Sequence, residues 1–317
     1  MSSKSNNQGR AYEYICLLSL YEEIYKIRPV EIEENSSFFA AKTAFETISE
    51  DLKQTLKESA LAAVYAIFDR EPLILEDDSD VLILKIQSDS KGKEGDVRDI
   101  LIIRSGIQWE IGLSLKHNHF AVKHSRLVKN LDFGEKWFDI PCSNQYWNDI
   151  KPIFDYLDDE KKKHNKWSDL PDKAQIVYIP LLTAFKNEII RRNKDNSDLP
   201  KKMVEYLLGE FDFYKVISID SRHLTQIQTY NLRGTLNRNG IKTKRKFIVP
   251  LASLPTRIVH IDFKPGSDNT VELYLDGGWQ FSFRIHNAST YVETSLKFDV
   301  QIVGMPTSII SIDCKWN

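Results

Sequence analysis

The sequence predicts an α/β fold of the α+β type, in which N-terminal helices precede a central β-hairpin and a β-rich C-terminal region. Three features support this prediction. Apolar residues recur at helical spacing up to residue 68, two apolar runs flank a Ser105-Gly106 turn, and short alternating segments fill the last third of the chain. With 317 residues and 42% hydrophobic content, the chain can form one large domain or two closely packed ones.

The first part of the chain has the periodicity of amphipathic helices. From Arg10 to Lys26 apolar side chains recur at helical spacing, which predicts a helix with a wide buried face. A second helical stretch, as one helix or two, runs from about Ser37 to Phe68, and Pro72 ends it. Helical and loop segments are expected through 117–217.

The periodicity changes to that of strands after residue 80. A strand is expected at 81–86, and a hairpin is expected from Asp99 to Lys116. Further strands are expected at 247–250, 257–263, 270–275, 279–285, 295–303 and 309–312. We therefore divide the chain into a helical and catalytic part, residues 1–220, and a β-rich part, residues 221–317, that contacts DNA and packs on the first.

Composition excludes several classes of protein. The formal net charge of −2 does not by itself indicate a nucleic-acid partner, although basic residues can still gather on one face. Cys16, Cys142 and Cys314 are too widely spaced for a disulfide framework or a structural zinc site. Because the sequence has neither an apolar run of about 20 residues nor a signal-peptide pattern, we expect a cytoplasmic protein without a membrane span.

The expected hairpin carries an arrangement suited to phosphodiester hydrolysis. That reaction needs a bound metal ion, an activated water and stabilisation of charge on the phosphoryl group. Side chains alternate along a strand, so Glu110, Gly112, Ser114 and Lys116 share one face. Folding about the turn places Asp99 opposite this strand, where it and Lys116 can approach one metal–phosphate centre.

This arrangement resembles the PD-(D/E)XK nucleases, in which an Asp opens one strand and an acid-x-Lys motif follows on the next. Here Ser114 occupies the position of the acid. Glu110 precedes Lys116 by six residues, about 20 Å along the strand, and is a candidate for a second position rather than a direct replacement for Ser114. Glu13 resembles the metal-supporting Glu that many of these enzymes carry on their first helix, although a helix-start glutamate also interacts favourably with the helix dipole.

The resemblance implies a restriction-endonuclease-like PD-(D/E)XK core and a Mg²⁺ cofactor held by Asp99 and Glu13. The catalytic candidates are Asp99, Lys116, Glu13, Ser114 and Glu110. We interpret Asp96 as a structural residue that caps the preceding turn.

A cluster of basic residues follows the hairpin directly. Its histidines, lysines, Asn and Arg suit phosphate oxygens and base edges, and the candidates are His117, Asn118, His119, Lys123, His124 and Arg126. Two alternative interpretations of this cluster have less support. A zinc site built from the three histidines lacks a suitable fourth ligand, and the letters His-Asn-His match the name of another nuclease family by coincidence.

Two later segments also suit DNA. The stretch 233–246 is basic and rich in Gly, Asn and Thr, so it is either a DNA-contacting loop or an ordinary solvated one. Its candidates are Arg233, Arg238 and Lys244. At the end of an expected strand, Arg284, His286 and Asn287 add side chains suited to guanine and adenine edges.

Several contiguous segments are similar to the HaeIII family of type II restriction endonucleases. These segments are residues 5–13, 95–104, 109–126, 207–215 and 283–289. The resemblance implies Mg²⁺-dependent cleavage of double-stranded DNA at GGCC with blunt ends, and a cognate DNA methyltransferase that protects the host. A palindromic site cut on both strands implies that two protomers act together at cleavage, as a homodimer on DNA. The alternatives are a non-restriction nuclease of the same fold and a catalytically inactive DNA-binding protein, suggested by Ser114.

Overall fold

The computed structural model describes residues 2–88 and 95–316, and they form two compact units. Unit 1 comprises residues 1–120, 209–253 and 307–317, and unit 2 comprises residues 121–208 and 254–306. The expected boundary at residue 220 does not coincide with a division between the units. It falls in the turn that joins two neighbouring strands of unit 1.

Unit 1 is built around a seven-stranded mixed sheet in the order β1-β2-β3-β4-β6-β7-β12. β1 pairs with β2, and β4 with β6, in parallel, whereas the other neighbours are antiparallel. The strands are β1 (Val30–Glu33), β2 (Leu82–Ile86), β3 (Ile100–Arg104), β4 (Trp109–His117), β6 (Phe213–Ile219), β7 (Leu224–Tyr230) and β12 (Ser311–Lys315).

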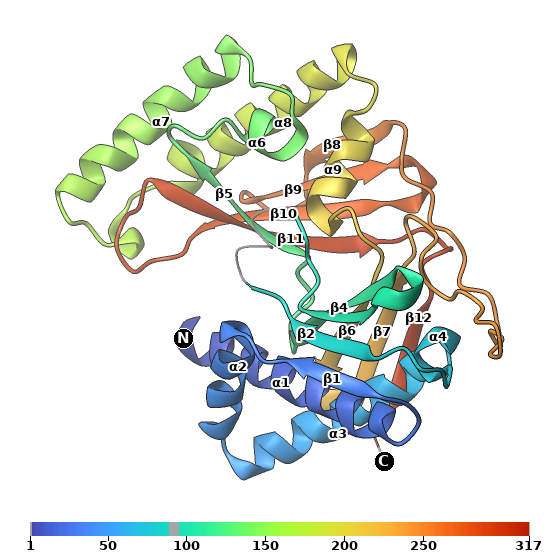
Figure 1. The fold of residues 1–317 in the computed structure, drawn as a ribbon. Coiled ribbons are helices and arrows are strands. Elements are labelled where there is room, and N and C mark those ends of the chain that lie inside the picture. The colour runs from blue at the N-terminus through green and yellow to red at the C-terminus, as the bar shows by residue number, and fades with distance from the viewer. Residues whose placement is uncertain (1, 89–94, 317) are drawn as a thin grey trace. The chain divides into compact units, whose positions relative to one another are not determined.

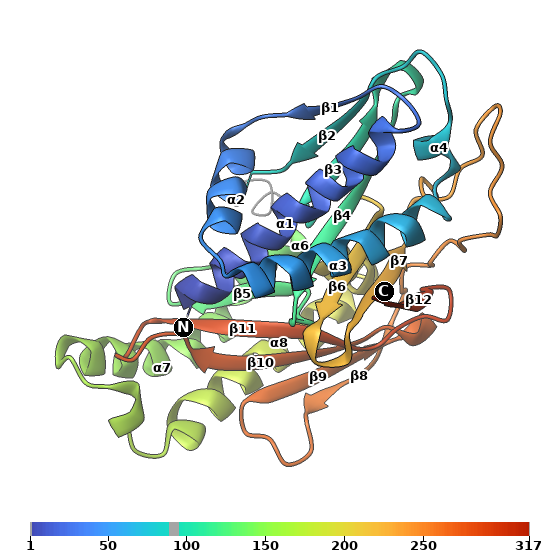
Figure 2. The same ribbon diagram turned by 90° about the horizontal axis from the view of Figure 1, so that it is seen from below.

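Helices cover one face of this sheet. The two longest, α1 (Ser2–Tyr25) and α3 (Glu50–Phe68), run across it, as Figures 1 and 2 show. α2 (Ser36–Glu46) packs on α1, and the short α4 (Pro72–Leu75) follows α3. The core between helices and sheet contains Leu113 and Leu115 from β4, Val216 from β6 and Ile227 from β7. Residues that alternate with these therefore point to the opposite face of the sheet.

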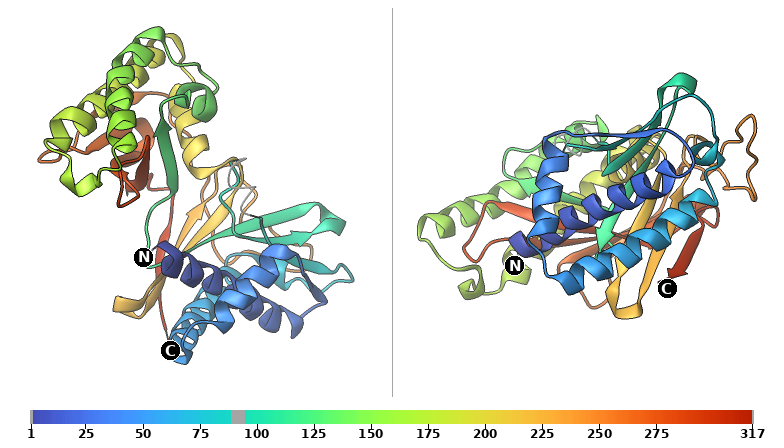
Figure 3. Two further views of the ribbon diagram at one scale, coloured as in Figure 1. Left: turned by 90° about the vertical axis from the view of Figure 1, so that its left-hand side faces the viewer. Right: turned by 60° about the horizontal axis from the view of Figure 1, so that its bottom comes forward.

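Unit 2 combines a five-stranded antiparallel sheet with a group of helices (Figure 3). The sheet order is β5-β11-β10-β9-β8, with β5 (Lys123–Val128), β8 (Ile258–Phe263), β9 (Thr270–Leu275), β10 (Gln280–Asn287) and β11 (Ser295–Gly304). The helices are α6 (Phe133–Phe138), α7 (Asn144–Lys162), α8 (Ile179–Asp195) and α9 (Leu199–Leu208). Phe185 of α8 packs on Phe283 and Phe298, so this face of the sheet is buried.

Many expected elements are confirmed, including the hairpin of β3 and β4, the first helix and the strands β8 to β11. The stretch from residue 37 to 68 forms two helices. The expected strand at 247–250 is wrong, because the Asn231 and Asn237 side chains bond the backbone of Val249 in place of a neighbouring strand. β1, β5, β6 and β7 were missed. β6 is buried along its whole length and so lacks the alternation that marks a half-exposed strand.

No helix among the described residues has the length and apolar character needed to cross a bilayer.

A buried carboxyl group ties the helices of unit 1 to the sheet and to the loop after β7. Glu71, at the start of α4, accepts hydrogen bonds at Oε1 from the Tyr214 hydroxyl at 2.5 Å and from the Asn237 backbone N–H at 2.7 Å. Burial raises the pKa of Glu71 to about 8, and the two hydrogen bonds offset only part of this rise. At neutral pH the folded protein therefore holds a proton that the unfolded chain releases.

This proton makes stability depend on pH. Between an unfolded pKa of 4.5 and a folded pKa of about 8, folding binds a proton at Glu71, so its contribution to the free energy of unfolding falls as pH rises through this window. Glu71→Gln keeps an acceptor oxygen but cannot bind this proton. We therefore expect the free energy of unfolding of this variant to fall less with pH, by up to a few kcal/mol, since each unit of pKa difference corresponds to about 1.4 kcal/mol. Urea unfolding of the unmodified protein and of the variant across this pH range would measure the difference. The same dependence of unfolding free energy on pH in both proteins would contradict the proton at Glu71.

Candidate active site

Asp99 and Lys116 meet where β3 begins and β4 ends. The backbone N–H of Asp99 donates to the Leu113 carbonyl at 2.7 Å, which continues the antiparallel register of Ile100 with Leu113. Asp99 Oδ2 accepts from the Leu115 backbone N–H at 2.6 Å and from Lys116 Nζ at 3.3 Å. Both side chains are 26% exposed. The predicted approach of this acid and this lysine across the hairpin is present.

Ser114 lies in a polar row that crosses four strands. It stands opposite Asp99 in the hairpin register and pairs with Lys215 on β6, which in turn pairs with Gln228 on β7. Ser114 and Lys215 are each 4% exposed. The row lies on the sheet face that α1 and α3 leave uncovered, together with Lys116 two residues further along β4.

Lys215 was not among the residues predicted from the sequence. It lies in a segment that was noted for its family resemblance alone. A signal is nevertheless present, because Lys215 is the one charged residue within the largely apolar run of Phe213–Ile219.

Glu110 belongs to a separate ion-pair network. Its carboxylate pairs with Arg98 at 2.9 Å, and the Arg98 side chain also donates three hydrogen bonds to Asp96, at 2.7, 2.8 and 3.1 Å. The guanidinium lies 4.0 Å from the ring centroid of Phe211. Burial alone would raise the pKa of Asp96, but the hydrogen bonds from Arg98 hold it below its usual value. The structure therefore places Glu110 away from the Asp99–Lys116 pair, and Asp96 has the structural contacts that were expected.

Arg98 reaches this network by crossing Gly112 of β4. A methyl group at position 112 would lie 2.1 Å from Arg98 Cδ, so the crossing requires glycine. Because Arg98 directly precedes Asp99, its contact with Gly112 also restrains the backbone at Asp99, the catalytic candidate.

Glu13 lies on α1 near the same end of β4. Its neighbour Tyr12 packs against His117, with ring centroids 6.4 Å apart, and His117 directly follows Lys116. Glu13 is partly exposed. The polar contacts of Asp99 are with Leu115 and Lys116, so Glu13 is not hydrogen-bonded to it.

The donor set at Asp99 suits a hard cation that retains waters. Within the described residues no hydrogen bond or ion pair reaches Asp99 Oδ1, which leaves this oxygen available as a ligand. The described part of the chain contains no group of three or more His, Cys, Asp and Glu side chains that could enclose a metal ion. Mg²⁺ fits such a centre because it is commonly held by one or two carboxylates, with water and phosphate oxygens as its other ligands.

The residues after Lys116 are tied to the turn that follows β6. His117 Nε2 lies 2.7 Å from Asp220 Oδ2, and the Asn118 amide donates to the same oxygen at 2.9 Å. His119 is exposed. The zinc alternative receives no support, because His117 bonds Asp220 whereas His124 bonds Asp299 of unit 2 at 2.9 Å.

Unit 2 presents a basic sheet face, which we define as His124, Arg126, Arg284, His286, Lys297 and Asp299. Strand register aligns these residues in two rows, Arg284–Asp299–His124 and His286–Lys297–Arg126. Asp299 is the acid at its centre and pairs with Arg284 and His124, each at 2.9 Å. Burial alone would raise the pKa of Asp299, but Arg284 and the other basic neighbours hold it below its usual value.

Two predicted DNA contacts lie elsewhere in unit 2. Lys123 points to the buried side of β5, where its Nζ donates to the Tyr206 carbonyl at 2.6 Å, and burial lowers its pKa to about 8. The Asn287 amide bonds the backbone carbonyls of Ser289 and Tyr291. Since strand residues alternate in direction, neither shares the basic sheet face with its even-numbered neighbours.

The basic loop after β7 is held firmly at its base. The Asp212 carboxylate accepts from the backbone N–H groups of Leu232, Arg233 and Thr235 at 2.5, 2.7 and 2.7 Å. Arg238 and Lys244 are exposed, and neither forms a side-chain hydrogen bond or ion pair with any described residue. The loop therefore presents cations from an anchored backbone.

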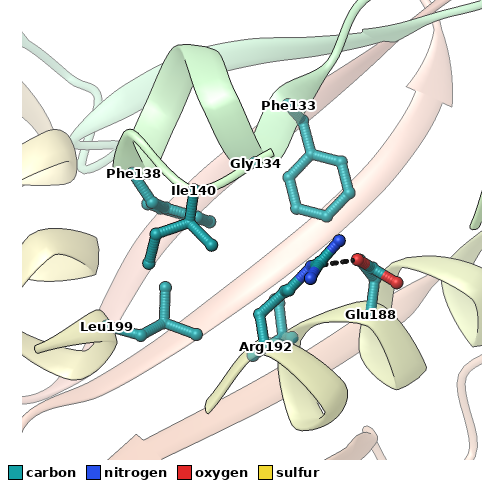
Figure 4. Close-up of a pocket in the computed structure, with 8 residues that line it drawn as sticks. Phe133, Gly134, Phe138, Ile140, Glu188, Arg192 and Leu199 are labelled. Carbon is teal, nitrogen blue, oxygen red and sulfur yellow. Dashed lines mark hydrogen bonds and ion pairs between the residues drawn. The ribbon is translucent and has the colours of Figure 1, made fainter. Parts of the chain in front are cut away.

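A small hollow in unit 2 is drawn in Figure 4. It is lined mainly by apolar side chains of α6, α8 and α9, and the ion pair of Arg192 with Glu188 lies at its edge. It contains none of the predicted site residues.

Comparison with known proteins identifies the family of this chain. The family model described as HaeIII restriction endonuclease matches residues 9–306. The chain belongs to the HaeIII restriction endonuclease family, and it is a type II site-specific deoxyribonuclease. It is 53% identical to "Type II restriction enzyme HaeIII" of Haemophilus aegyptius over 317 residues, which cover 100% of this chain and 99% of that protein. No solved structure matches the chain.

The crossing of Arg98 over Gly112 gives a direct test of the local geometry. We expect Gly112→Ala to displace Arg98 from Asp96 and Glu110, to cost about 1–3 kcal/mol of stability through overpacking, and to slow DNA cleavage. Thermal unfolding and plasmid cleavage measure the two effects. Gly9→Ala is the matched control, because a methyl group there meets no atom within 4 Å. Equal behaviour of the two variants would show that Arg98 can move without consequence.

Proposed function

We propose that this enzyme hydrolyses double-stranded DNA at GGCC, leaves blunt ends, requires Mg²⁺ and uses a PD-(D/E)XK centre. The observation that carries the proposal is the contact of Asp99 with Lys116, 3.3 Å apart at the end of a hairpin, with Asp99 Oδ1 open. An acid and a lysine at this separation can hold a metal ion and a water against one phosphate. The 53% identity to the HaeIII enzyme supports the target, since segments carrying candidate residues lie within the matched range.

Each side chain of the centre has a distinct task in this proposal. Asp99 Oδ1, with Glu13 as a supporting carboxylate, would hold Mg²⁺, and the ion would supply Lewis-acid stabilisation of the phosphate and make a water more acidic. Lys116 orients the attacking water and neutralises charge on the phosphate. The hydrogen bond from the Leu115 backbone to Asp99 Oδ2 keeps this carboxylate in place, at 2.6 Å. Ser114 occupies the usual acid position and leaves the centre with less negative charge.

The basic sheet face of unit 2 and the anchored loop of unit 1 are proposed as DNA-binding surfaces. Arg126, Lys297 and Arg284 are cationic side chains on the exposed side of one sheet, and arginine suits both phosphate and guanine. In unit 1, Arg238 and Lys244 suit backbone phosphates, with Arg233 at the base of the loop. His117 and Asn118, held by Asp220, and the exposed His119 lie next to Lys116 and suit the strand that is cut.

A palindromic target has consequences beyond one chain. Two scissile phosphates related by two-fold symmetry require two active centres, so we propose that two protomers act together on DNA. A cell that contains this enzyme must protect its own sites, so we also propose a cognate DNA methyltransferase as a functional partner in the cytoplasm.

Plasmid digestion with end-sequencing tests the function directly. With Mg²⁺ we expect discrete fragments ending in GG and CC without overhangs, and with EDTA we expect none. Discrete fragments at another sequence would retain the nuclease and refute the GGCC target. DNA binding without cleavage would favour an inactive DNA-binding protein, as Ser114 suggested.

Variants assign the catalytic tasks in the same assay. Asp99→Ala and Lys116→Ala should each slow cleavage by at least about 10²-fold, because each removes a group at the phosphoryl centre, while DNA affinity in Ca²⁺ stays close to that of the unmodified enzyme. Glu13→Gln should raise the Mg²⁺ concentration required for half-maximal cleavage. Cleavage at the unmodified rate by either alanine variant would refute this centre, and an unchanged Mg²⁺ requirement would remove Glu13 from it.

The DNA-binding face can be tested by salt dependence. Arg126→Ala and Arg284→Ala should each weaken DNA binding and reduce the slope of log affinity against log salt by about one, as expected for loss of a phosphate contact. Arg222→Ala is the control, because Arg222 is an exposed arginine of unit 1 that pairs with Asp313 at 3.5 Å. Salt slopes that match the control would show that the basic sheet face does not contact phosphates. A loss of affinity confined to duplexes that contain GGCC would indicate contact with bases.

A further inference from the structure

Lys215 is a lysine buried in the central sheet of unit 1. It is 4% exposed, and its Nζ donates to the Phe120 carbonyl at 2.8 Å. Among residues 2–88 and 95–316, no carboxylate forms an ion pair with it. Burial of an ammonium group that lacks a carboxylate partner is costly, so a neutral residue of similar size would be favoured if packing were its purpose.

The position of Lys215 connects it to the cleavage centre. Strand register places it beside Ser114, and Ser114 lies beside Asp99, so the three residues form one row on one face. The charged groups near Lys215 on this sheet face are Asp99, which directly precedes β3, and Lys116 of β4, while Gln228 of β7 is neutral. Burial lowers the pKa of Lys215 to about 7, and repulsion from Lys116 adds to this effect.

The charge of the row differs from that of the usual pattern. The usual pattern supplies two carboxylates and one lysine, whereas this centre has one carboxylate, Asp99, and two lysines, Lys116 and Lys215. Compared with a centre of the usual pattern, this centre repels cations more strongly and attracts the phosphate more strongly. In the proposed centre this added positive charge would act on the phosphate, whose negative charge grows during hydrolysis, and charge in a water-poor site acts strongly.

We propose that Lys215 is a positioning residue of this nuclease, whose buried ammonium group compensates for the missing acid by stabilising the scissile phosphate and by fixing the Phe120 carbonyl. The inference rests on the proposed phosphodiester centre at Asp99 and Lys116. Because Lys215 is 4% exposed, this role does not require its amine to touch the phosphate. It acts by its charge and through residues 117–120, which follow Lys116 and end at the carbonyl that Lys215 holds.

Two substitutions separate charge from hydrogen bonding. Lys215→Arg keeps the positive charge, and Lys215→Gln keeps a donor for the Phe120 carbonyl but loses the charge. We expect single-turnover cleavage to be roughly 10- to 100-fold slower for the Gln variant, with partial or full activity in the Arg variant. Lys186→Gln is the control, because it removes the charge of a lysine that pairs with Asp262 in unit 2.

Proton uptake gives a readout that does not depend on cleavage. An anion that approaches Lys215 raises its affinity for a proton, so duplex binding in Ca²⁺ should take up at most about one proton per centre in buffer about one pH unit above its pKa. Calorimetry in two buffers of different ionisation enthalpy measures this uptake. It should be lost in both Lys215 variants and kept in Lys186→Gln.

The outcomes distinguish this inference from the proposed function. A folded Gln variant that cleaves within about twofold of the unmodified enzyme would overturn the role of the charge. A twofold change is well below the effect expected when a group that stabilises the phosphoryl centre is lost. If the Gln variant does not fold, the Arg variant decides, because unchanged proton uptake in it would overturn the inference. If the unmodified enzyme binds DNA with proton uptake but does not cut, the catalytic proposal fails while Lys215 remains a phosphate-linked group.

Discussion

The parallel pairing of β4 with β6 is the constraint on which the site depends. It places Lys215 beside Ser114, while the antiparallel hairpin places Asp99 on the other side of Ser114. A shift of either register by one residue would turn the affected side chains to the helix-covered face. The apolar residues that alternate with them, Leu113, Leu115 and Val216, prevent such a shift because they fill the core under α1 and α3.

The surroundings of Asp99 show how a polar centre is held at the end of an apolar sheet. The Leu115 backbone and Lys116 occupy one oxygen of the carboxylate, which leaves the other for a ligand. One residue earlier, Arg98 lies flat across Gly112 and connects Asp96 with Glu110. The acid that directly precedes the strand is thus fixed from both sides, and a fixed carboxylate loses little entropy when it binds a cation.

Positive charge is concentrated at particular places although the chain as a whole is slightly acidic. In unit 2, cross-strand register gathers basic side chains from β5, β10 and β11 around Asp299. In unit 1, Asp212 anchors the loop that carries Arg238 and Lys244. Acidic residues in both units therefore orient cations, which explains how a protein of near-neutral net charge can present surfaces suited to a polyanion.

Local sequence determined the hairpin, the first helices and the pairing of Asp99 with Lys116, because short-range periodicity and a Gly turn specify these elements. It also indicated which basic residues could meet DNA, but not their direction. Lys123 and Asn287 face away from the basic sheet face because strand residues alternate, and the strand at Lys123 was not recognised. Strand alternation places Glu110 on the same face as Ser114 and Lys116, but only the tertiary structure shows that its carboxylate pairs with Arg98. Only the tertiary structure brought Lys215 to Ser114, because a parallel pairing joins residues about a hundred positions apart and leaves no local trace in the sequence.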